Sequence, residues 1–348
     1  MNVAQLEPQS SVLSASGPKP SPERFFSTMT AYQTTAMLRA AIDLDLFTVI
    51  GDGDSTVPDL ARRIQGSERG LRMLCDALTV SGFLTKSEGR YGLTFDSHVF
   101  LDRTSRTYIG DATRFLTSEV VTSGFRDLAA VVRSGRPLAE KPFPGSEHPI
   151  WVEFARSMAA IAYVPAQVMA KLLQSDKKIR VLDIAAGHGM YGLAIAQANS
   201  QAEIIAQDWP SVLPVASENA ERFGVLDRFS VLPGDALEID FGSGFDVIVV
   251  ANLLHHWAPE AILRFHRKAH SALGPGGKLV IVEFAPNEDR LSPSLAAQFV
   301  LPMLAHTVDG DAYTVSEHRR MLQQSGFRTC EPHMLLPTPA TAIIAPKL

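Results

Sequence analysis

Residues 179–196 constrain the fold of this chain more than any other stretch. Residues 179–182 are short, partly β-branched and mostly apolar, which is typical of a strand buried in a parallel sheet. Ala185, Ala186, Gly187 and Gly189 leave the following turn with few bulky side chains, and a helix is predicted to begin near Gly192. Small side chains let a ligand approach the backbone, and the N-terminus of a helix favours polar ligands. The stretch therefore predicts a nucleotide-binding corner of an α/β sheet.

The next predicted strand, at residues 202–208, ends in Asp208. At this spacing a carboxylate accepts hydrogen bonds from both hydroxyls of a ribose. The loop lacks the G-x-G-x-x-G pattern of dinucleotide-binding proteins, because Ala185 replaces the first glycine. This departure argues against NAD and favours a nucleoside without a pyrophosphate. The alternative, a glycine-rich turn that serves packing alone, is weakened by the acid on the neighbouring strand.

Strand and helix patterns alternate from residue 179 to the C-terminus. The predicted strands are 179–185, 202–208, 229–233, 245–251, 277–284, 328–335 and 340–346. The last two have no helix between them and must be antiparallel, whereas the others are joined by crossover helices. The sequence thus predicts an α/β fold with a doubly wound, seven-stranded, mostly parallel sheet. Residues 106–175 are expected to be mostly helical.

Composition excludes several classes of partner. The formal charge of −5 would not attract nucleic acid or an anionic membrane, and no apolar run has the length of a membrane span. The 2 cysteines, Cys75 and Cys330, are too few for a disulfide framework. A histidine-only zinc site lacks a third ligand, so no metal is expected. Residues 1–20 are rich in Ser and Pro without an apolar segment, which predicts a disordered tail on a cytoplasmic protein.

Residues 21–105 are predicted to form a winged-helix domain. A helical pattern covers residues 25–46, two helices capped by Thr56 and Ser67 follow, and a hairpin is predicted at residues 82–94. The apolar face of the second capped helix comprises Leu71, Leu74, Leu78 and Val80. The apolar faces exceed what so small a domain buries alone, which predicts a homodimer formed through this domain.

A ligand-sensing DNA-binding protein is the alternative that a winged helix raises. The second capped helix does carry Arg69 and Arg72. It also carries Glu68 and Asp76, and the rest of it is apolar. This charge pattern disfavours a recognition helix, so no nucleic-acid partner is expected.

Three titratable residues are predicted at the carboxyl edge of the sheet. His255 and His256 follow the strand at 245–251, and Glu283 ends the strand at 277–284. A neutral histidine can accept a proton from a hydroxyl near pH 7, and a buried glutamate needs a donor such as an imidazole. Neighbouring side chains beyond a strand end are expected to point in different directions, so only one histidine should face the ligand. Packed histidines and a loop-capping Glu283 are the alternative interpretation.

Two further motifs have both a functional and a structural interpretation. Asp235 follows the strand at 229–233, where it either accepts from an adenine amino group or forms a Gly-Asp turn. One face of a predicted helix carries Trp151, Phe154, Met158, Ile161 and Val164. Such a face more often belongs to a core than to a ligand pocket.

Several motifs together carry a resemblance to a known family. They are Leu182-Asp-Ile-Ala-Ala-Gly-His-Gly189, Asp208-Trp-Pro210, Gly234-Asp235, Leu254-His-His-Trp257, Gly276-Gly-Lys278 and Val282-Glu283. The chain resembles, over residues 25–348, the small-molecule O-methyltransferases that use S-adenosylmethionine. These are the caffeate and acetylserotonin type and its bacterial relatives in secondary metabolism. In this family a winged-helix domain dimerises, and residues 106–348 would form the methyltransferase domain, with a helical substrate-capping insertion at 106–175.

The resemblance implies a set of residues that bind S-adenosylmethionine. The loop at 183–189 would hold the methionine part, Asp208 the ribose, and Asp235 with Ala236 the adenine, on which Trp209 would stack. The full set is Asp183, Ala185, Gly187, Gly189, Asp208, Trp209, Gly234, Asp235, Ala236 and Asn252. Asn252 belongs to it because it lies at the same sheet edge.

The resemblance also implies catalytic and substrate residues. His255 occupies the position of the general base, and Glu283 that of the carboxylate that orients it. The substrate positions are Phe154, Met158, Met303, His306 and Thr307, and the candidate lid residues are Phe25, Phe26, Met29 and Tyr32. The implied reaction is methyl transfer to a hydroxyl of a small aromatic or polyketide-like molecule.

The surroundings of His255 depart from the family pattern. His256 replaces an aspartate, Ala251 replaces a lysine, and a second glutamate is missing near Val315. Methylation at carbon or nitrogen, or a cofactor-assisted reaction without methyl transfer, therefore remains an alternative.

Overall fold

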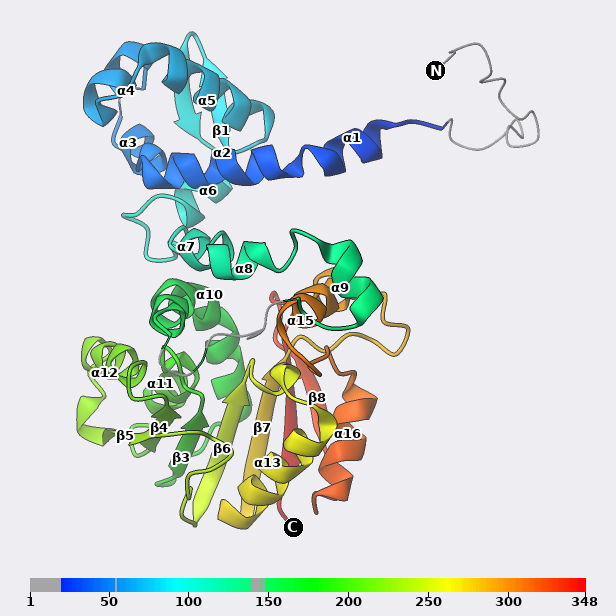
Figure 1. Ribbon diagram of the computed structural model, residues 1–348. Helices are drawn as coiled ribbons and strands as arrows, with labels where there is room; N and C mark the ends of the chain where they lie inside the picture. Colours follow the sequence, from blue (N-terminus) through cyan, green and yellow to red (C-terminus); the bar gives the residue numbers. More distant parts are fainter. Residues whose placement is uncertain (1–19, 54, 139–144, 146–147) are drawn as a thin grey trace, which may run out of the picture. The chain divides into compact units, whose positions relative to one another are not determined.

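The computed structural model describes residues 20–53, 55–138, 145 and 148–348. The predicted disordered tail lies outside the described residues, apart from Pro20. The chain divides into two compact units, Met1–Thr104 and Ser105–Leu348, labelled by element in Figure 1. No helix within the described ranges is long and apolar enough to cross a membrane.

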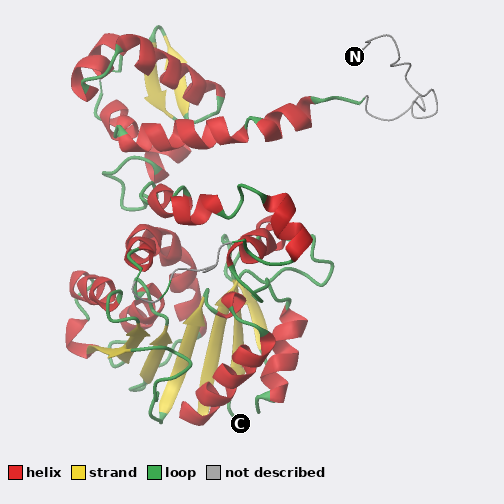
Figure 2. Ribbon diagram, viewed as in Figure 1, coloured by secondary structure: helices red, strands yellow, loops and turns green. Residues whose placement is uncertain are grey.

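The first unit packs short helices against a two-stranded hairpin (Figure 2). Its elements are α1 (Glu23–Met29), α2 (Ala31–Asp43), α3 (Leu46–Gly51), α4 (Val57–Ile64), α5 (Glu68–Val80), β1 (Leu84–Ser87), β2 (Arg90–Leu93) and α6 (Phe95–Phe100). The Thr56 hydroxyl accepts from the backbone N–H of Asp59, and the Ser67 hydroxyl from that of Gly70, so both helix caps are as predicted. β1 and β2 are antiparallel, as the hairpin pattern predicts.

Two details of this unit differ from the prediction. The helical pattern at residues 25–46 is divided into three helices, because Thr30 leaves the helical conformation and Asp45 has a left-handed φ of 54°. Val80 is 90% exposed instead of lying on the buried face of α5, because that helix ends at it. The core is formed by residues such as Leu46, Phe47, Leu60, Leu71 and Leu78.

The second unit is built on a seven-stranded sheet of order β5-β4-β3-β6-β7-β9-β8. The strands are β3 (Arg180–Ile184), β4 (Glu203–Asp208), β5 (Phe229–Pro233), β6 (Phe245–Ala251), β7 (Leu273–Glu283), β8 (Glu331–Met334) and β9 (Thr341–Pro346). The first five in spatial order are parallel, whereas β9 is antiparallel to both β7 and β8. The predicted sheet is confirmed. β7 begins earlier than predicted, since Leu273 pairs with Phe245 across an irregularity in the ladder.

Helices cover both faces of this sheet (Figure 2). They are α7 (Ala112–Leu116), α8 (Glu119–Ser123), α9 (Leu128–Ser134), α10 (Ile150–Leu172), α11 (Met190–Ala198), α12 (Leu213–Arg222), η2 (Leu226–Arg228), η3 (Leu254–His256), α13 (Pro259–Ala272), α14 (Ser294–Gln298), α15 (Val300–His306) and α16 (Val315–Gln324). Val181 and Val249 pack with α10 and α11, whereas Leu182 and Ile248 pack with α13 and α16. Strand residues thus alternate between two cores.

The sheet register brings the candidate residues to one edge. Ile184 pairs with Gln207 on one side and with Val250 on the other, and Val250 pairs with Ile281. The four strands β4, β3, β6 and β7 therefore end at nearly the same level. The loops that follow them meet at the edge where ligands bind in open α/β sheets.

Candidate active site

The loop after β3 has a backbone that few residues adopt easily. Ala185 has φ 49°, Gly187 φ 55° and Gly189 φ 76°. Positive φ strains residues that carry a Cβ, so Ala185 is held there by its surroundings. α11 begins at Met190, two residues earlier than predicted, and its N-terminus follows this loop directly.

Two buried carboxylates hold this loop. Asp183 Oδ2 accepts from the backbone N–H of Gly192 at 2.9 Å, and Asp208 Oδ2 accepts from that of Gly187 at 2.7 Å. Asp208 Oδ1 also accepts from the backbone N–H of Trp209 at 2.6 Å. Burial raises the pKa of Asp183 to about 7 and that of Asp208 to about 6. Each Asp208 oxygen keeps a second lone pair, which leaves acceptors for a polar ligand.

Gln207 is a site residue that the motifs do not reveal. Its Nε2 donates to the carbonyl of Gly234 at 2.6 Å, and its Oε1 accepts from the backbone N–H of Ala185 at 3.3 Å. It therefore ties the loop after β3 to the loop after β5. Only the parallel order β5-β4-β3 gives Gln207 this place between the two loops.

The loop after β5 is shaped by its own polar contacts. Gly234 has φ 141°, and a Cβ there would lie 2.2 Å from the side chain of Ile239. Asp235 Oδ1 accepts from the backbone N–H of Leu237 at 2.8 Å, and the carbonyl of Ala236 accepts from Lys268 Nζ at 3.0 Å. Asp235 thus forms the predicted turn, with its other oxygen still available as an acceptor.

Asn252 stands at the end of β6 with a left-handed φ of 52°. Its backbone N–H donates to the carbonyl of Val282 at 2.9 Å. Its Oδ1 is buried and, among the described residues, has no hydrogen-bond partner. A buried acceptor without a donor is costly, so this oxygen is a place where a ligand N–H or O–H would be stabilising.

His255 and Glu283 form a buried pair. His255 Nδ1 lies 2.6 Å from Glu283 Oε2, and the two residues are 5% and 2% exposed. Glu283 Oε1 accepts from the backbone N–H groups of Leu253 and Leu254 at 3.1 and 2.9 Å. Burial would raise the pKa of Glu283, but the charge and hydrogen bond of His255 outweigh it, so this pKa lies below its usual range. Glu283 therefore both caps the loop and meets the imidazole.

The expectation that His256 points away from His255 is wrong. The Nε2 atoms of the two rings are 3.1 Å apart and the ring centroids 4.3 Å. The reason is that β6 has already ended and both residues lie in the 3₁₀ turn η3, where the alternation of a strand no longer applies.

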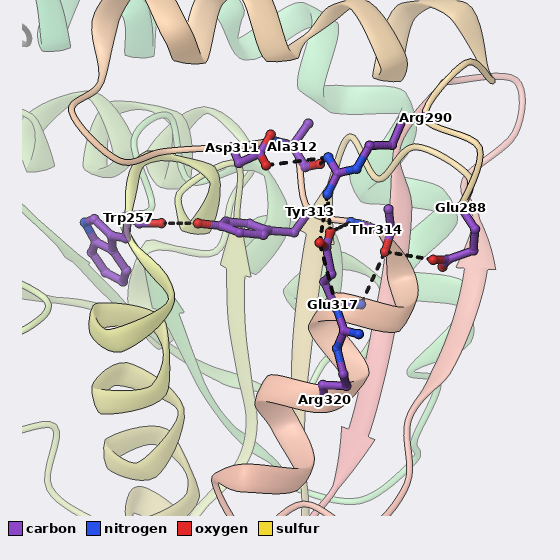
Figure 3. A network of polar contacts seen from close by, with 9 residues as sticks. All are labelled: Trp257, Glu288, Arg290, Asp311, Ala312, Tyr313, Thr314, Glu317 and Arg320. Carbon is purple, nitrogen blue, oxygen red and sulfur yellow. Dashed lines mark hydrogen bonds and ion pairs between the residues drawn. The ribbon is translucent and has the colours of Figure 1, made fainter. Parts of the chain in front are cut away.

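A polar network supports the segment after the histidines (Figure 3). The Tyr313 hydroxyl donates to the carbonyl of Trp257 at 2.7 Å. Arg290 contacts both oxygens of Glu317 at 2.7 and 2.8 Å, and the capping box of α16 fixes Thr314 against Glu317. The loops around Arg290 and Tyr313 are thereby fixed next to η3.

A close backbone approach adds to this support. A Cβ on Gly310 would lie 2.3 Å from the carbonyl oxygen of His255. The backbone N–H of Gly310 donates to Thr307 Oγ1 at 2.9 Å, and that hydroxyl donates to the carbonyl of Met303 at 2.7 Å. The hydrogen of Thr307, a predicted substrate contact, is therefore engaged within the loop.

Aromatic and apolar side chains surround the pair. Phe299 packs edge-on against the His255 ring at 4.9 Å and Phe284 lies 4.9 Å from Phe299. The Phe154 ring on α10 packs against Phe115 at 5.0 Å, and a Cβ on Gly187 would lie 4.0 Å from it. The structure thus brings Phe154 to the cofactor loop and adds Phe299, which no motif indicates.

The other predicted substrate residues are placed as follows. Met158 is half-buried on α10, while Met303 and His306 are buried on α15. The His306 ring lies 3.0 Å from the carbonyl of Val121 and 5.6 Å from Phe125. Trp209 is half-buried and packs with Val212 and Val215.

His318 is a further buried histidine at this site. It lies on α16 and is 1% exposed, with its ring 5.9 Å from that of Tyr313. Burial lowers its pKa to about 4, against the opposing charges of Glu283 and Glu317. No sequence motif reveals His318, which lies about one turn after Val315, the position near which the family's second glutamate is missing. Among the described residues, no cluster of three or more His, Cys, Asp or Glu could hold a metal ion.

The comparisons with known proteins show the family of the chain. Residues 126–328 match the O-methyltransferase domain, and residues 26–103 match the O-methyltransferase dimerisation domain. A Nostoc punctiforme structure described as a candidate O-methyltransferase is 44% identical, with a TM-score of 0.90 over 95% of this chain and 100% of that chain. Human N-acetylserotonin methyltransferase, solved in complex with S-adenosylmethionine, is 20% identical with a TM-score of 0.81 over 96% of this chain and 99% of its own.

Two curated relatives are less similar in sequence than the Nostoc punctiforme protein. The 3-hydroxy-5-methyl-1-naphthoate 3-O-methyltransferase of Streptomyces sahachiroi is 24% identical over 84% of this chain and 85% of its own. The L-tyrosine C(3)-methyltransferase of Streptomyces lavendulae is 26% identical over 83% and 82%. The family match and the named relatives identify an S-adenosylmethionine-dependent methyltransferase. The chain belongs to the O-methyltransferase family.

Proposed function

We propose that this enzyme methylates a hydroxyl of a small aromatic or polyketide-like molecule, with His255 as the general base and Glu283 as the residue that orients it. The observation that carries the proposal is the buried contact of 2.6 Å between His255 Nδ1 and Glu283 Oε2. A carboxylate accepts only, so Nδ1 holds the hydrogen and the lone pair of neutral His255 is on Nε2.

The base has a defined task. A phenol has a pKa of about 10, so little phenolate exists at pH 7, and a positioned base contributes about 10²–10⁴ in rate. When bound, S-adenosylmethionine supplies an electrophilic methyl group on a sulfonium. His255 takes the hydroxyl proton, and Glu283 stabilises the imidazolium that results. Phe299 packs edge-on against the His255 ring and Phe284 packs against Phe299, so the surroundings of the base are partly apolar.

The residues at the sheet edge fit the cofactor. We assign the methionine part to the loop of Asp183, Ala185, Gly187 and Gly189, the ribose to Asp208, and the adenine to Gly234, Asp235, Ala236 and Trp209. The unpartnered Oδ1 of Asn252 would accept a hydrogen bond from an amino group of the cofactor. The residues fit the cofactor because their carboxylate and amide oxygens can accept hydrogen bonds from its hydroxyl and amino groups. The glycines of the loop also leave room for its methionine part.

The acceptor class is supported by the apolar surroundings of the imidazole and by the relatives. Phe154, Met158, Met303, His306 and Thr307 remain the proposed substrate residues. One relative is named for 3-O-methylation of a hydroxynaphthoate, and another for 6-O-methylation in mitomycin biosynthesis. One relative, however, is named for methylation at carbon of L-tyrosine, which keeps that alternative.

The reaction is tested with a panel of phenols, naphthols and polyketide-like hydroxyl compounds and with S-adenosylmethionine labelled in its methyl group. Mass spectrometry detects transfer, and NMR of the product identifies the methylated atom. A labelled methoxy group supports the proposal. A methyl group on carbon or nitrogen, or none with any acceptor, contradicts it.

We also propose that two chains form a homodimer through the winged-helix domain at 21–105, beside a methyltransferase domain at 106–348 with its helical insertion at 106–175. The support is the dimerisation-domain match at 26–103 and the exposed apolar side chains Phe25, Phe26, Met29 and Tyr32. Both cysteines are free, which suits a reducing, cytoplasmic location.

A further inference from the structure

His255 and His256 are joined through their Nε2 atoms, which lie 3.1 Å apart. Such a contact is a hydrogen bond only if one nitrogen carries a hydrogen and the other a lone pair. The two ring planes are inclined by 56°, and the ring centroids are 4.3 Å apart.

Glu283 determines which of the two histidines donates. Its carboxylate meets His255 Nδ1 at 2.6 Å and accepts two backbone N–H groups, so it serves as an acceptor only. The hydrogen of neutral His255 is then on Nδ1 and its lone pair on Nε2. His256 must therefore present an Nε2–H to that lone pair.

The surroundings keep His256 neutral. Burial lowers the pKa of His256 well below its ordinary value, and the neighbouring His255 and His306 lower it further. On the other side of the pair, Glu283 and His318 face His255. His256 is thus neutral near pH 7, which leaves it able to donate one ring N–H.

We propose that His256 is a second catalytic residue, whose Nε2–H donates a hydrogen bond to the acceptor oxygen while His255 takes the proton from it. The inference rests on the proposed function, in which His255 is the base. Two nitrogens 3.1 Å apart both lie within hydrogen-bond distance of one oxygen placed beside them. An entering hydroxyl replaces the contact between the two rings.

In this step the O–H bond of the acceptor breaks and its proton goes to His255 Nε2. The oxygen forms a bond to the methyl carbon, and the electron pair of the broken C–S bond stays on sulfur. The hydrogen bond from His256 stabilises the negative charge that develops on the oxygen. An ionised aspartate, which the family resemblance places at this position, has no hydrogen to donate, so His256 changes the electrostatics of the site.

The test compares His256→Leu with His256→Asn, which keeps an N–H, on the working acceptor and on a more acidic nitro-substituted version of it. We expect His256→Leu to lower kcat about 10²-fold, His256→Asn to recover much of this, and the loss to shrink on the acidic acceptor. His270→Gln is the control, because His270 lies near the C-terminal end of α13, whereas His256 precedes the N-terminal end of that helix. Calorimetry with S-adenosylhomocysteine checks that cofactor affinity is unchanged.

Each outcome separates this inference from the proposed function. The role of His256 is overturned if His256→Leu keeps its kcat, or if its kcat falls equally on both acceptors and His256→Asn recovers none of it. In that case a large loss of kcat in His255→Ala still supports His255 as the base. No loss in His255→Ala overturns the proposed function itself. Nitrogen-15 NMR of histidine-labelled protein gives an independent readout. We expect a neutral His256 with its hydrogen on Nε2, and its signals are assigned by their absence from the spectrum of His256→Asn. A His256 with its only ring hydrogen on Nδ1 would overturn the inference.

Discussion

Glu283 holds both the ring of His255 and the backbone that carries it. One carboxylate oxygen lies 2.6 Å from His255 Nδ1, and the other accepts from the N–H groups of Leu253 and Leu254. The position and the tautomer of the imidazole therefore depend on the same side chain. A change at Glu283 acts on the geometry of the turn and on its chemistry together.

His255→Ala is expected to lower kcat by about 10²–10⁴ while the affinity for the cofactor stays nearly constant, because the variant loses the base and none of the proposed cofactor contacts. Steady-state kinetics and calorimetric titration measure the two quantities. If the variant keeps most of its activity at pH 7, the acceptor needs no base.

Glu283→Gln is expected to lower kcat by a similar factor of about 10²–10⁴. If the glutamine oxygen takes the two backbone N–H groups, its NH₂ faces His255 Nδ1 and forces the other tautomer, which removes the lone pair from Nε2. Nitrogen-15 NMR of His255 reports the tautomer directly. A variant with the hydrogen still on Nδ1 and normal turnover would contradict this explanation.

Asp208→Ala is expected to weaken binding of S-adenosylmethionine at least about tenfold, because hydrogen bonds from two ribose hydroxyls to a carboxylate are lost. Asp227→Ala, an exposed acid after α12, is the control. Calorimetric titration of folded protein gives both affinities. Equal affinities would remove Asp208 from the cofactor site.

The free energy of unfolding of the ligand-free enzyme should depend on pH through Asp183, whose folded pKa is raised by burial to about 7. A raised acid pKa means that the folded state binds the proton more tightly than the unfolded chain. The stabilising contribution is therefore complete below the unfolded pKa of about 4 and is lost as pH rises through about 7, at up to about 1.4 kcal/mol per pH unit.

Asp183→Asn removes this titration and keeps an oxygen for the N–H of Gly192. Urea unfolding at pH 5 and pH 8 should show that the free energy of unfolding declines less between these two pH values in the variant than in the wild type. Identical pH dependence of the two proteins would show that Asp183 titrates normally.

Gly310→Ala is expected to destabilise the protein by about 1–3 kcal/mol and to lower kcat, because the new Cβ would push against the backbone of His255, the proposed base. Gly145→Ala is a matched control, since a Cβ there meets no described atom within 4 Å. Thermal unfolding and kinetics of both variants decide the matter. Wild-type behaviour of Gly310→Ala would mean that the turn has room to shift.

A Phe26→Glu, Met29→Glu double variant is expected to be monomeric at micromolar concentration, whereas the wild type is dimeric. Both side chains are exposed and apolar on α1. Leu226→Glu, on an exposed apolar residue outside the winged-helix domain, is the control and should remain dimeric. Light scattering of the full chain measures the mass, and a monomeric wild type would refute the proposed dimer.

The sequence by itself determined the elements and their order. Buried parallel strands are short apolar runs, helices begin at hydroxyl caps, and parallel strands need crossover helices, so the seven-stranded sheet followed from local pattern. Because parallel strands end at one edge, the placement of Asp208, His255 and Glu283 at the same edge of the sheet followed as well. These are consequences of backbone geometry that each segment carries on its own.

Only the tertiary structure decided how the side chains at that edge meet. The pairing of His255 with His256 depends on the 3₁₀ turn that replaces strand geometry after β6, and Gln207 bridges two loops only because of the strand order. Phe299 reaches His255 from a segment about forty residues later in the chain, and Gly310 does so from still further along. Such contacts depend on packing between distant segments, and no local periodicity encodes them.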